Sequence, residues 1–226
     1  MSLNTNKSNS SRPDIPPMEP GTYMARTVII ADLGLQVQAP FKGESKPPVE
    51  KVSFTYEFVD EFLQDEEGHD LTDKPRHLSE DMAIYPLTAE RAKSTLRAKA
   101  LDPTDSTGGN LGLLVDTPCM VTVVHNPRKD GGVWENIANV APMTTKAAKA
   151  CVELVNKARV FDLDEPDLDV FKSLPNFIQK KIVANLNFEG SKLQEMLGSK
   201  GADPDDEIPF EEETWENEGG SNENPY

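Results

Sequence analysis

Cysteine, histidine and tryptophan are scarce in this sequence of 226 residues, which has two cysteines, three histidines and two tryptophans. Cys119 and Cys151 lie in apolar stretches, and neither belongs to a CxxC pair or a Cys/His cluster. A disulfide framework is therefore not expected. The pattern predicts buried, reduced thiols of the kind found in cytoplasmic proteins.

Long hydrophobic runs are also missing. The longest apolar stretches are far shorter than the roughly 20 residues that a membrane-spanning helix needs. The first residues lack the apolar core of a secretory signal peptide. We therefore expect a soluble intracellular protein.

Signatures of catalysis are missing as well. His69, His77 and His125 are too far apart in the sequence to suggest a metal site, and each is better explained as a surface or core histidine. The phosphate-binding, dinucleotide-binding, serine-hydrolase and zinc-protease motifs are absent. The acids between residues 65 and 70 could offer oxygen ligands to Mg²⁺ or Ca²⁺, but they lack the alternation of a calcium loop, which favours a solvated loop. We predict that the protein is not an enzyme and that it binds no cofactor and no metal.

Positive charge is missing from the end of the chain. The sequence carries 39 acidic and 23 basic side chains, a net charge of −16, and residues 201–226 hold ten of the acids and no Lys or Arg. Residues 1–200 therefore keep a net charge of only −6. This balance does not exclude nucleic acid, because binding depends on whether cations gather on one face.

Residues 201–226 form an acidic tail that also contains Gly, Ser, Asn and Pro and has almost nothing that could build a core, so we expect it to be disordered. One short apolar group interrupts the tail, in the sequence Asp205-Asp206-Glu207-Ile208-Pro209-Phe210. Such an arm suits docking into a basic groove with an apolar floor on another protein. A merely solubilising tail is the alternative.

These six residues resemble the acidic docking tip of bacterial and phage single-stranded DNA-binding proteins, which usually reads Asp-Asp-x-Ile-Pro-Phe. In that family the Phe ends the chain, whereas sixteen residues follow Phe210 here. Either the motif works internally, or the terminal Asn224-Pro225-Tyr226 supplies the aromatic ring and the carboxylate. The resemblance implies recruitment of replication or recombination proteins through Asp205, Asp206, Ile208, Pro209, Phe210 and Tyr226.

Composition and periodicity divide the chain into four segments. Residues 1–19 are rich in Ser, Asn and Pro and are predicted to be a disordered arm. Residues 20–144 hold the strand patterns, and residues 145–200 change to helical periodicity. The helical extension could pack on the β domain, form a protomer interface or extend a DNA path, and we favour packing.

The clearest strand pattern lies in residues 51–62, where Val52, Phe54, Tyr56 and Phe58 alternate with polar residues. Further strands are expected at residues 22–38, 82–87, 119–125 and 133–140, with a helix at 89–100 that Thr88 begins and a polar loop at 61–80. In the extension we expect helices at 145–157, 167–173, 176–186 and 191–197, with residues 160–166 as a linker.

Five strands with a helix between the third and fourth is the order expected of an OB barrel, although a small sandwich would give a similar pattern. We therefore predict a mainly β fold with helical additions, in which an OB-like five-stranded barrel is followed by C-terminal helices and a disordered acidic tail. Two stretches resemble the OB-like domains of phage single-stranded DNA-binding proteins. They are Pro20-Gly21-Thr22-Tyr23-x-Ala25-Arg26-x-Val28 and Pro118-Cys119-x-Val121-Thr122-Val123.

Binding of single strands needs cations for the phosphates and exposed aromatic faces for the bases. Cations gather in two predicted loops and on the helix at 89–100, which has no acid after Glu90, although a solvated helix face is the alternative there. Phe41 and Trp134 adjoin the loop cations, whereas Tyr56 belongs either to a core stripe or to a stacking ladder. The candidate DNA-binding residues are Phe41, Lys42, Lys46, Tyr56, Arg91, Lys93, Arg97, Lys99, Arg128, Lys129 and Trp134.

The sequence therefore predicts a non-enzymatic protein that coats single-stranded DNA during phage or bacterial replication or recombination. Its partners would be the single strand itself and replication or recombination proteins, with homo-oligomers possible and the host cytoplasm as its location if it is phage-encoded. The alternative is a non-enzymatic adaptor or DNA-mimic protein, whose β domain binds protein and whose acidic tail mimics the charge of DNA.

Overall fold

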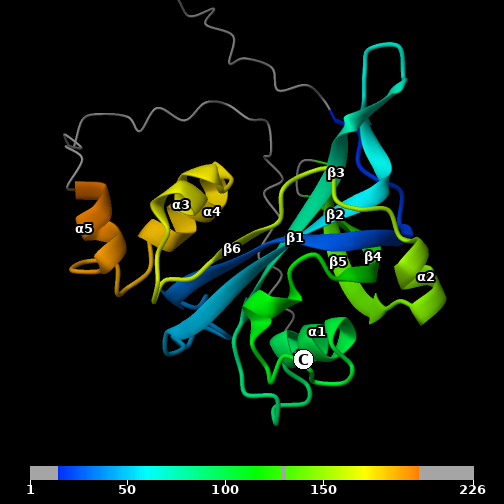
Figure 1. Cartoon of the computed structure of the whole chain (residues 1–226). Helices are drawn as coiled ribbons and strands as arrows, with labels where there is room; N and C mark the ends of the chain where they lie inside the picture. The colour runs from blue at the N-terminus through cyan, green and yellow to red at the C-terminus, as the bar shows by residue number, and fades with distance from the viewer. Residues whose placement is uncertain (1–14, 129–130, 199–226) are drawn as a thin grey trace, which may run out of the picture.

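The computed structural model describes residues 15–128 and 131–198 (Figure 1). The predicted docking residues of the acidic tail, Lys129 and most of the predicted N-terminal arm lie outside these ranges. The elements in chain order are β1 (Gly21–Gln36), β2 (Val49–Gln64), β3 (Asp70–Ala83), α1 (Lys93–Leu101), the 3₁₀ helix η1 (Leu111–Leu114), β4 (Pro118–Pro127), β5 (Val133–Pro142), α2 (Thr145–Ala150), β6 (Arg159–Phe161), α3 (Leu168–Ser173), α4 (Asn176–Val183) and α5 (Lys192–Gly198).

One six-stranded sheet organises the described residues, in the order β3-β2-β1-β4-β5, with β6 added beside β1. The five long strands pair antiparallel, and β6 runs parallel to β1. Because β1, β2 and β3 are consecutive neighbours and β4 returns to the free side of β1, the first four strands have Greek-key order. The predicted mainly β class with added helices is confirmed. The sheet is open, with β3 and β5 at its edges, so a closed barrel is not observed.

Strand β1 is the centre of the fold because it carries two ladders on one of its edges. Its first half pairs with β4 from Gly21 to Arg26, and its second half pairs with β6 from Ile29 to Ala31. The other edge pairs with β2, with register shifts after Thr27 and Asp32. The nearly continuous apolar run from Val28 to Leu33 suits this position, because both faces of the strand are buried there.

Two hydrophobic cores lie on the sheet. The larger one holds the alternating side chains of β2, including Phe54, Tyr56 and Phe58, together with residues of β4 and α1. The smaller core is made by β1, β6 and the helices α3, α4 and α5, with Ile178 and Ile182 fully buried. The helical extension therefore packs against the sheet, as favoured from the sequence, and forms a layer beside β6 (Figure 1).

Several predicted element boundaries were wrong. Strand β3 was predicted only from residue 82 onward, yet it begins at Asp70. Helix α1 begins at Lys93 with Ala92 as its N-cap, so Thr88 does not cap it. Helix α2 ends at Ala150, because Glu57 and Arg26 hold the following residues in an extended segment. The start of the linker predicted at residues 160–166 belongs to β6.

Residues 15–19 were predicted as part of the disordered arm, and this is corrected, because they form a strap that contacts both edge strands, β3 and β5. Met18 is buried in the larger core, and its backbone N–H donates to Oε1 of Glu135 on β5 at 2.7 Å. Arg76 on β3 donates to the same Glu135 oxygen at 3.0 Å and to the Pro16 carbonyl at 2.6 Å. His125 lies 2.6 Å from the Met18 carbonyl. These contacts link β3 to β5 through side chains where no ladder joins them.

Candidate nucleic-acid interface

The loop between β1 and β2, residues 37–48, presents an aromatic ring with two cations. Phe41 and Glu44 form an isolated bridge around the turn of Lys42 and Gly43, which both have positive φ. Phe41 is 40% exposed, and the Nζ atoms of Lys42 and Lys46 lie 5.3 and 5.0 Å from its ring centroid. Cations within about 6 Å of a ring are attracted to its face. This β1–β2 loop is therefore a compact group of positive charge and exposed ring.

The β4–β5 hairpin carries a second group of the same kind. The guanidinium carbon of Arg128 lies 4.1 Å from the ring centroid of Trp134, which is half-buried near the start of β5. The Arg128 backbone N–H donates to the Gly132 carbonyl at 2.8 Å, which closes the loop that joins β4 to β5. Arg128 itself is exposed. The predicted association of a loop cation with Trp134 is present.

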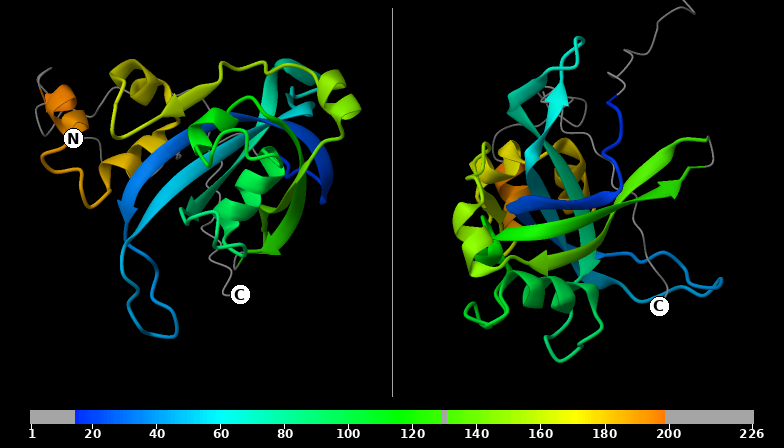
Figure 2. Two further views of the ribbon diagram at one scale, coloured as in Figure 1. Left: turned by 60° about the horizontal axis from the view of Figure 1, so that its bottom comes forward. Right: turned by 90° about the vertical axis from the view of Figure 1, so that its right-hand side faces the viewer.

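Both loops project from one side of the sheet. In the right-hand view of Figure 2 the β1–β2 loop extends to the right, as do the end of β4 and the start of β5, and in the left-hand view these parts point downward. The structure thus places two ring-and-cation groups, far apart in the sequence, on a common side of the molecule.

The predicted basic helix face divides into two parts. Arg97 is only 4% exposed, and it donates from Nε to Oε1 of Glu80 at 2.6 Å and from Nη2 to Oε2 at 3.0 Å. Its prediction as a phosphate contact is corrected, because the guanidinium is committed to a buried ion pair. Lys93 contributes a further 2.9 Å contact to Glu80 and stays partly exposed. Arg91, which precedes α1, and Lys99 are exposed.

The prediction that Tyr56 binds DNA is also wrong. The ring is fully buried in the larger core beside Phe54, and the hydroxyl donates to Oε1 of Glu80 at 2.9 Å. Burial, followed by the charge of Glu80, raises the pKa of Tyr56 well above its ordinary value. A base cannot reach this ring, so the core-stripe alternative is the right one.

A second buried carboxylate, Glu57, was missed by sequence reasoning. It accepts hydrogen bonds from the backbone N–H of Val155 at 2.6 Å and from Nδ2 of Asn156 at 2.7 Å, and it lies 3.1 Å from Nε2 of His77. Burial would raise the pKa of Glu57, but its contacts with His77, Asn156 and Val155 outweigh burial and lower it. Glu57 therefore fixes the extended segment that leads from α2 to β6. The only signal in the sequence was an acid within a strong strand.

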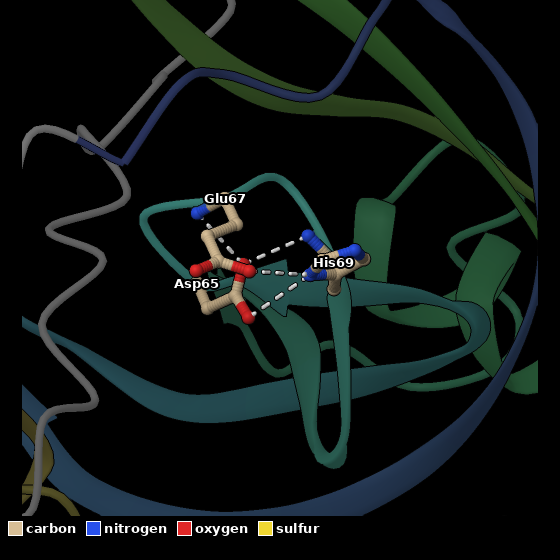
Figure 3. A group of neighbouring side chains, drawn as sticks. All are labelled: Asp65, Glu67 and His69. Carbon is tan, nitrogen blue, oxygen red and sulfur yellow. Dashed lines mark hydrogen bonds and ion pairs between the residues drawn. The ribbon is translucent and has the colours of Figure 1, made fainter.

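The acids of the β2–β3 hairpin lie around a turn (Figure 3). Oδ1 of Asp65 accepts from the backbone N–H groups of Glu67 and His69, both at 2.9 Å, and these bonds lower the pKa of Asp65. Ligand atoms of Asp65, Glu67 and His69 lie within 4.8 Å of one another, and all three residues are exposed. The hydrogen bonds explain the grouping as turn formation, so the cluster by itself indicates no metal.

The two cysteines are free and buried, as expected. Burial raises the pKa of the Cys119 thiol to about 12, with a smaller contribution from Cys151. A thiol with so high a pKa is a poor nucleophile at neutral pH. Cys119 therefore does not point to catalytic or redox chemistry.

No helix among the described residues is long and apolar enough to cross a membrane. No protein-family model matches the sequence, and a search of curated proteins found no match. A function can therefore be inferred only from the residues of this chain.

Proposed function

We propose that this chain is a single-stranded DNA-binding protein that coats DNA during phage or bacterial replication or recombination, in the cytoplasm. The observation that carries the proposal is the pair of ring-and-cation groups, Phe41 with Lys42 and Lys46, and Trp134 with Arg128. Stacking surfaces combined with phosphate contacts are what binding to single strands requires. The resemblance of residues 205–210 to the docking tip of this family supports the same function.

The topology supports an OB-type domain. An OB fold is a partly open, five-stranded Greek-key barrel that binds oligonucleotides through the loop between strands 1 and 2, the loop between strands 4 and 5, and the face of strands 2 and 3. The order β3-β2-β1-β4-β5, with α1 between β3 and β4, fits this description. The contacts of Arg76 and Met18 with Glu135 would then close the barrel at its seam. The two ring-and-cation groups lie on the two loops that an OB fold uses.

The experiment is fluorescence anisotropy of labelled oligo(dT), compared with a duplex of equal length, across a salt series. We expect salt-dependent binding to the single strand, with a log-log slope of about −0.7 for each phosphate neutralised, and little binding to the duplex. Phe41→Ala and Trp134→Ala should each weaken binding by about fivefold or more, because a base stacked on an aromatic ring contributes about 1–3 kcal/mol. His69→Ala, an exposed ring on the acidic hairpin, is the matched control and should bind like the wild type.

Trp134 also gives an intrinsic signal. The chain has a second tryptophan, Trp215, in the acidic tail, so the measurement needs the Trp215→Phe background. Stacking of a base should quench the remaining fluorescence on titration with oligo(dT). Unchanged fluorescence at saturating oligo(dT) would remove Trp134 from the interface.

The acidic tail has two proposed roles in this function. It would recruit replication or recombination proteins through residues 205–210 or Tyr226, and it would compete for the basic loops when DNA is absent. A chain that ends at Lys200 should bind oligo(dT) more tightly at low salt, because ten negative charges are removed. Equal affinity of the full and shortened chains at low salt would rule out competition and leave recruitment as the only role.

A second candidate is an adaptor or DNA mimic, and the β2–β3 hairpin favours it. This hairpin extends away from the sheet and carries the exposed acids Asp65, Glu66 and Glu67 (Figure 1). A protein that uses such acids would bind a basic partner and ignore oligo(dT). The same anisotropy series therefore separates the two functions.

A further inference from the structure

Exposed apolar side chains collect at the end of the sheet from which the β1–β2 loop emerges. Gln36 pairs with Val49 and Lys51 pairs with Ala83, so the end of β1, the start of β2 and the end of β3 lie together. Val37 is 67% exposed and Tyr85 is 45% exposed just beyond these ends. Phe41 belongs to the loop that joins the first two of them. Tyr85 therefore lies at the base of the proposed β1–β2 binding loop.

The backbone around Tyr85 is firmly held. The N–H of Ile84 continues the β2–β3 ladder by donating to the Glu50 carbonyl at 2.8 Å. The N–H of Tyr85 donates to Oγ of Ser94 at 3.1 Å, and Oγ1 of Thr95 donates to the Pro86 carbonyl at 3.3 Å. Ser94 and Thr95 are buried in α1. The exposed ring thus stands on a segment anchored to both the sheet and the helix.

The contacts of the Tyr85 side chain within the described residues show no structural role for it. Within residues 15–128 and 131–198, its hydroxyl has no hydrogen-bond partner, and no cation or second ring lies against its ring. A ring with nearly half of its surface exposed, on a backbone held by hydrogen bonds to the sheet and to α1, is suited to stacking, because little conformational freedom is lost on binding.

A cation follows Tyr85 within the same short segment. The N–H of Ala89 donates to the Pro86 carbonyl and that of Ala92 to the Ala89 carbonyl, which folds residues 86–92 into two successive turns. Arg91 lies in the second turn, is exposed, and makes no ion pair with any residue that the structure describes. Ring and cation are therefore brought into one compact segment, as in the two loops.

We propose that Tyr85 and Arg91 form a third contact point for the single strand, with a base stacked on Tyr85 and a phosphate held by Arg91. The single-stranded DNA would then run from the β1–β2 loop across the end of the sheet to the start of α1. This inference rests on the proposed DNA-binding function and extends the binding site beyond the two loops.

The test compares Tyr85→Ala and Tyr85→Phe by oligo(dT) anisotropy across a salt series. Tyr85→Ala should raise Kd by about fivefold or more without changing the salt slope, because a stacking ring and no charge is lost. Tyr85→Phe should bind like the wild type, since the ring is kept. Arg91→Ala should reduce the magnitude of the salt slope by about 0.7. Val183→Ala, an exposed apolar residue on α4, is the control and should have no effect.

A cross-linking experiment on the unaltered chain keeps the inference testable if a variant folds poorly. Ultraviolet cross-linking to an oligonucleotide with 5-iodouracil should yield a modified peptide that contains Tyr85. A Kd within twofold of the wild type for Tyr85→Ala, or cross-links confined to the two loops, would overturn the third contact point while leaving the proposed function intact. Absence of oligo(dT) binding by the wild type would overturn both.

Discussion

Arg97 of α1 and Glu80 of β3 form a buried bidentate ion pair, with Nε to Oε1 at 2.6 Å and Nη2 to Oε2 at 3.0 Å. Tyr56 donates to the same carboxylate, and Lys93 contacts it from the solvent side. Burial would raise the pKa of Glu80, but Arg97 and Lys93 outweigh burial and lower it. The helix between β3 and β4 is thus fixed to the sheet by charge as well as by apolar packing.

Removal of Arg97 should destabilise the protein severely. Arg97→Ala leaves the buried Glu80 carboxylate without its main partner, and loss of one member of a buried pair costs about 3–5 kcal/mol. Urea unfolding followed by far-UV circular dichroism measures the change. Arg91→Ala, an exposed cation from the same region, should change the unfolding free energy by no more than about 0.5 kcal/mol. Equal effects of the two substitutions would contradict the burial of the ion pair.

Acid stability should depend on Glu57. Its pKa is lowered in the folded protein, so its contribution to stability is complete above the ordinary glutamate pKa of about 4.3 and is lost as the pH falls through the lowered value. The unfolding free energy of the wild type should therefore fall below about pH 4.3 more steeply than that of Glu57→Gln.

Glu50→Gln is the control for this pH series. Burial, followed by the charges of Asp32 and Asp164, raises the pKa of Glu50, so protonation at low pH favours the folded state there. In Glu50→Gln the unfolding free energy should therefore fall at low pH as steeply as in the wild type, or more steeply. A flatter profile for Glu50→Gln than for Glu57→Gln would reverse the assignment.

Lys42→Asn should weaken oligo(dT) binding and stabilise the fold. Lys42 has a φ of 51°, a left-handed conformation that Asn tolerates better than Lys. We expect the unfolding free energy to rise by up to about 1 kcal/mol, while oligo(dT) binding weakens and its salt slope loses about 0.7. Lys46→Asn removes the matching charge over Phe41 from a residue without positive φ, so it should weaken binding with no gain in stability.

Cys119 should resist modification until the protein unfolds. With a pKa of about 12, on the order of one thiol in ten thousand is ionised at pH 8. In the Cys151→Ser variant, reaction with a disulfide reagent should be negligible in native buffer and complete in urea. Fast labelling in native buffer would show that the thiol is accessible and ionised.

The strand pattern of the larger core could be predicted from the sequence, and that of β3 could not. In β2 every inward position from Val52 to Phe58 is apolar or aromatic, which gives a clean period of two. In β3 the inward positions Leu78, Glu80 and Met82 include a carboxylate, because Arg97 neutralises it from α1. A charged residue at a core position interrupts the alternation of apolar and polar residues, so β3 cannot be recognised from its own sequence.

The candidate site shows the same division. The grouping of Phe41 with Lys42 and Lys46 could be predicted, because ring and cations are neighbours in the sequence as well as in space. Arg97 and Tyr56 were mispredicted because their common buried partner, Glu80, lies 17 and 24 residues away in the sequence. Tyr85 was passed over because its exposure follows from the register of three strand ends, which the sequence does not state.

The strap at residues 15–19 sets an order on folding. The contact of Met18 with Glu135 joins residues 117 positions apart, and that of Met18 with His125 joins residues 107 apart. During synthesis, residue 18 leaves the ribosome long before β5 exists, so it cannot make these contacts until the residues of β4 and β5 have also been synthesised. Contacts of such long range form slowly, because a large loop must close first. Residues 15–19, although they are synthesised early, are therefore among the last to reach their native place.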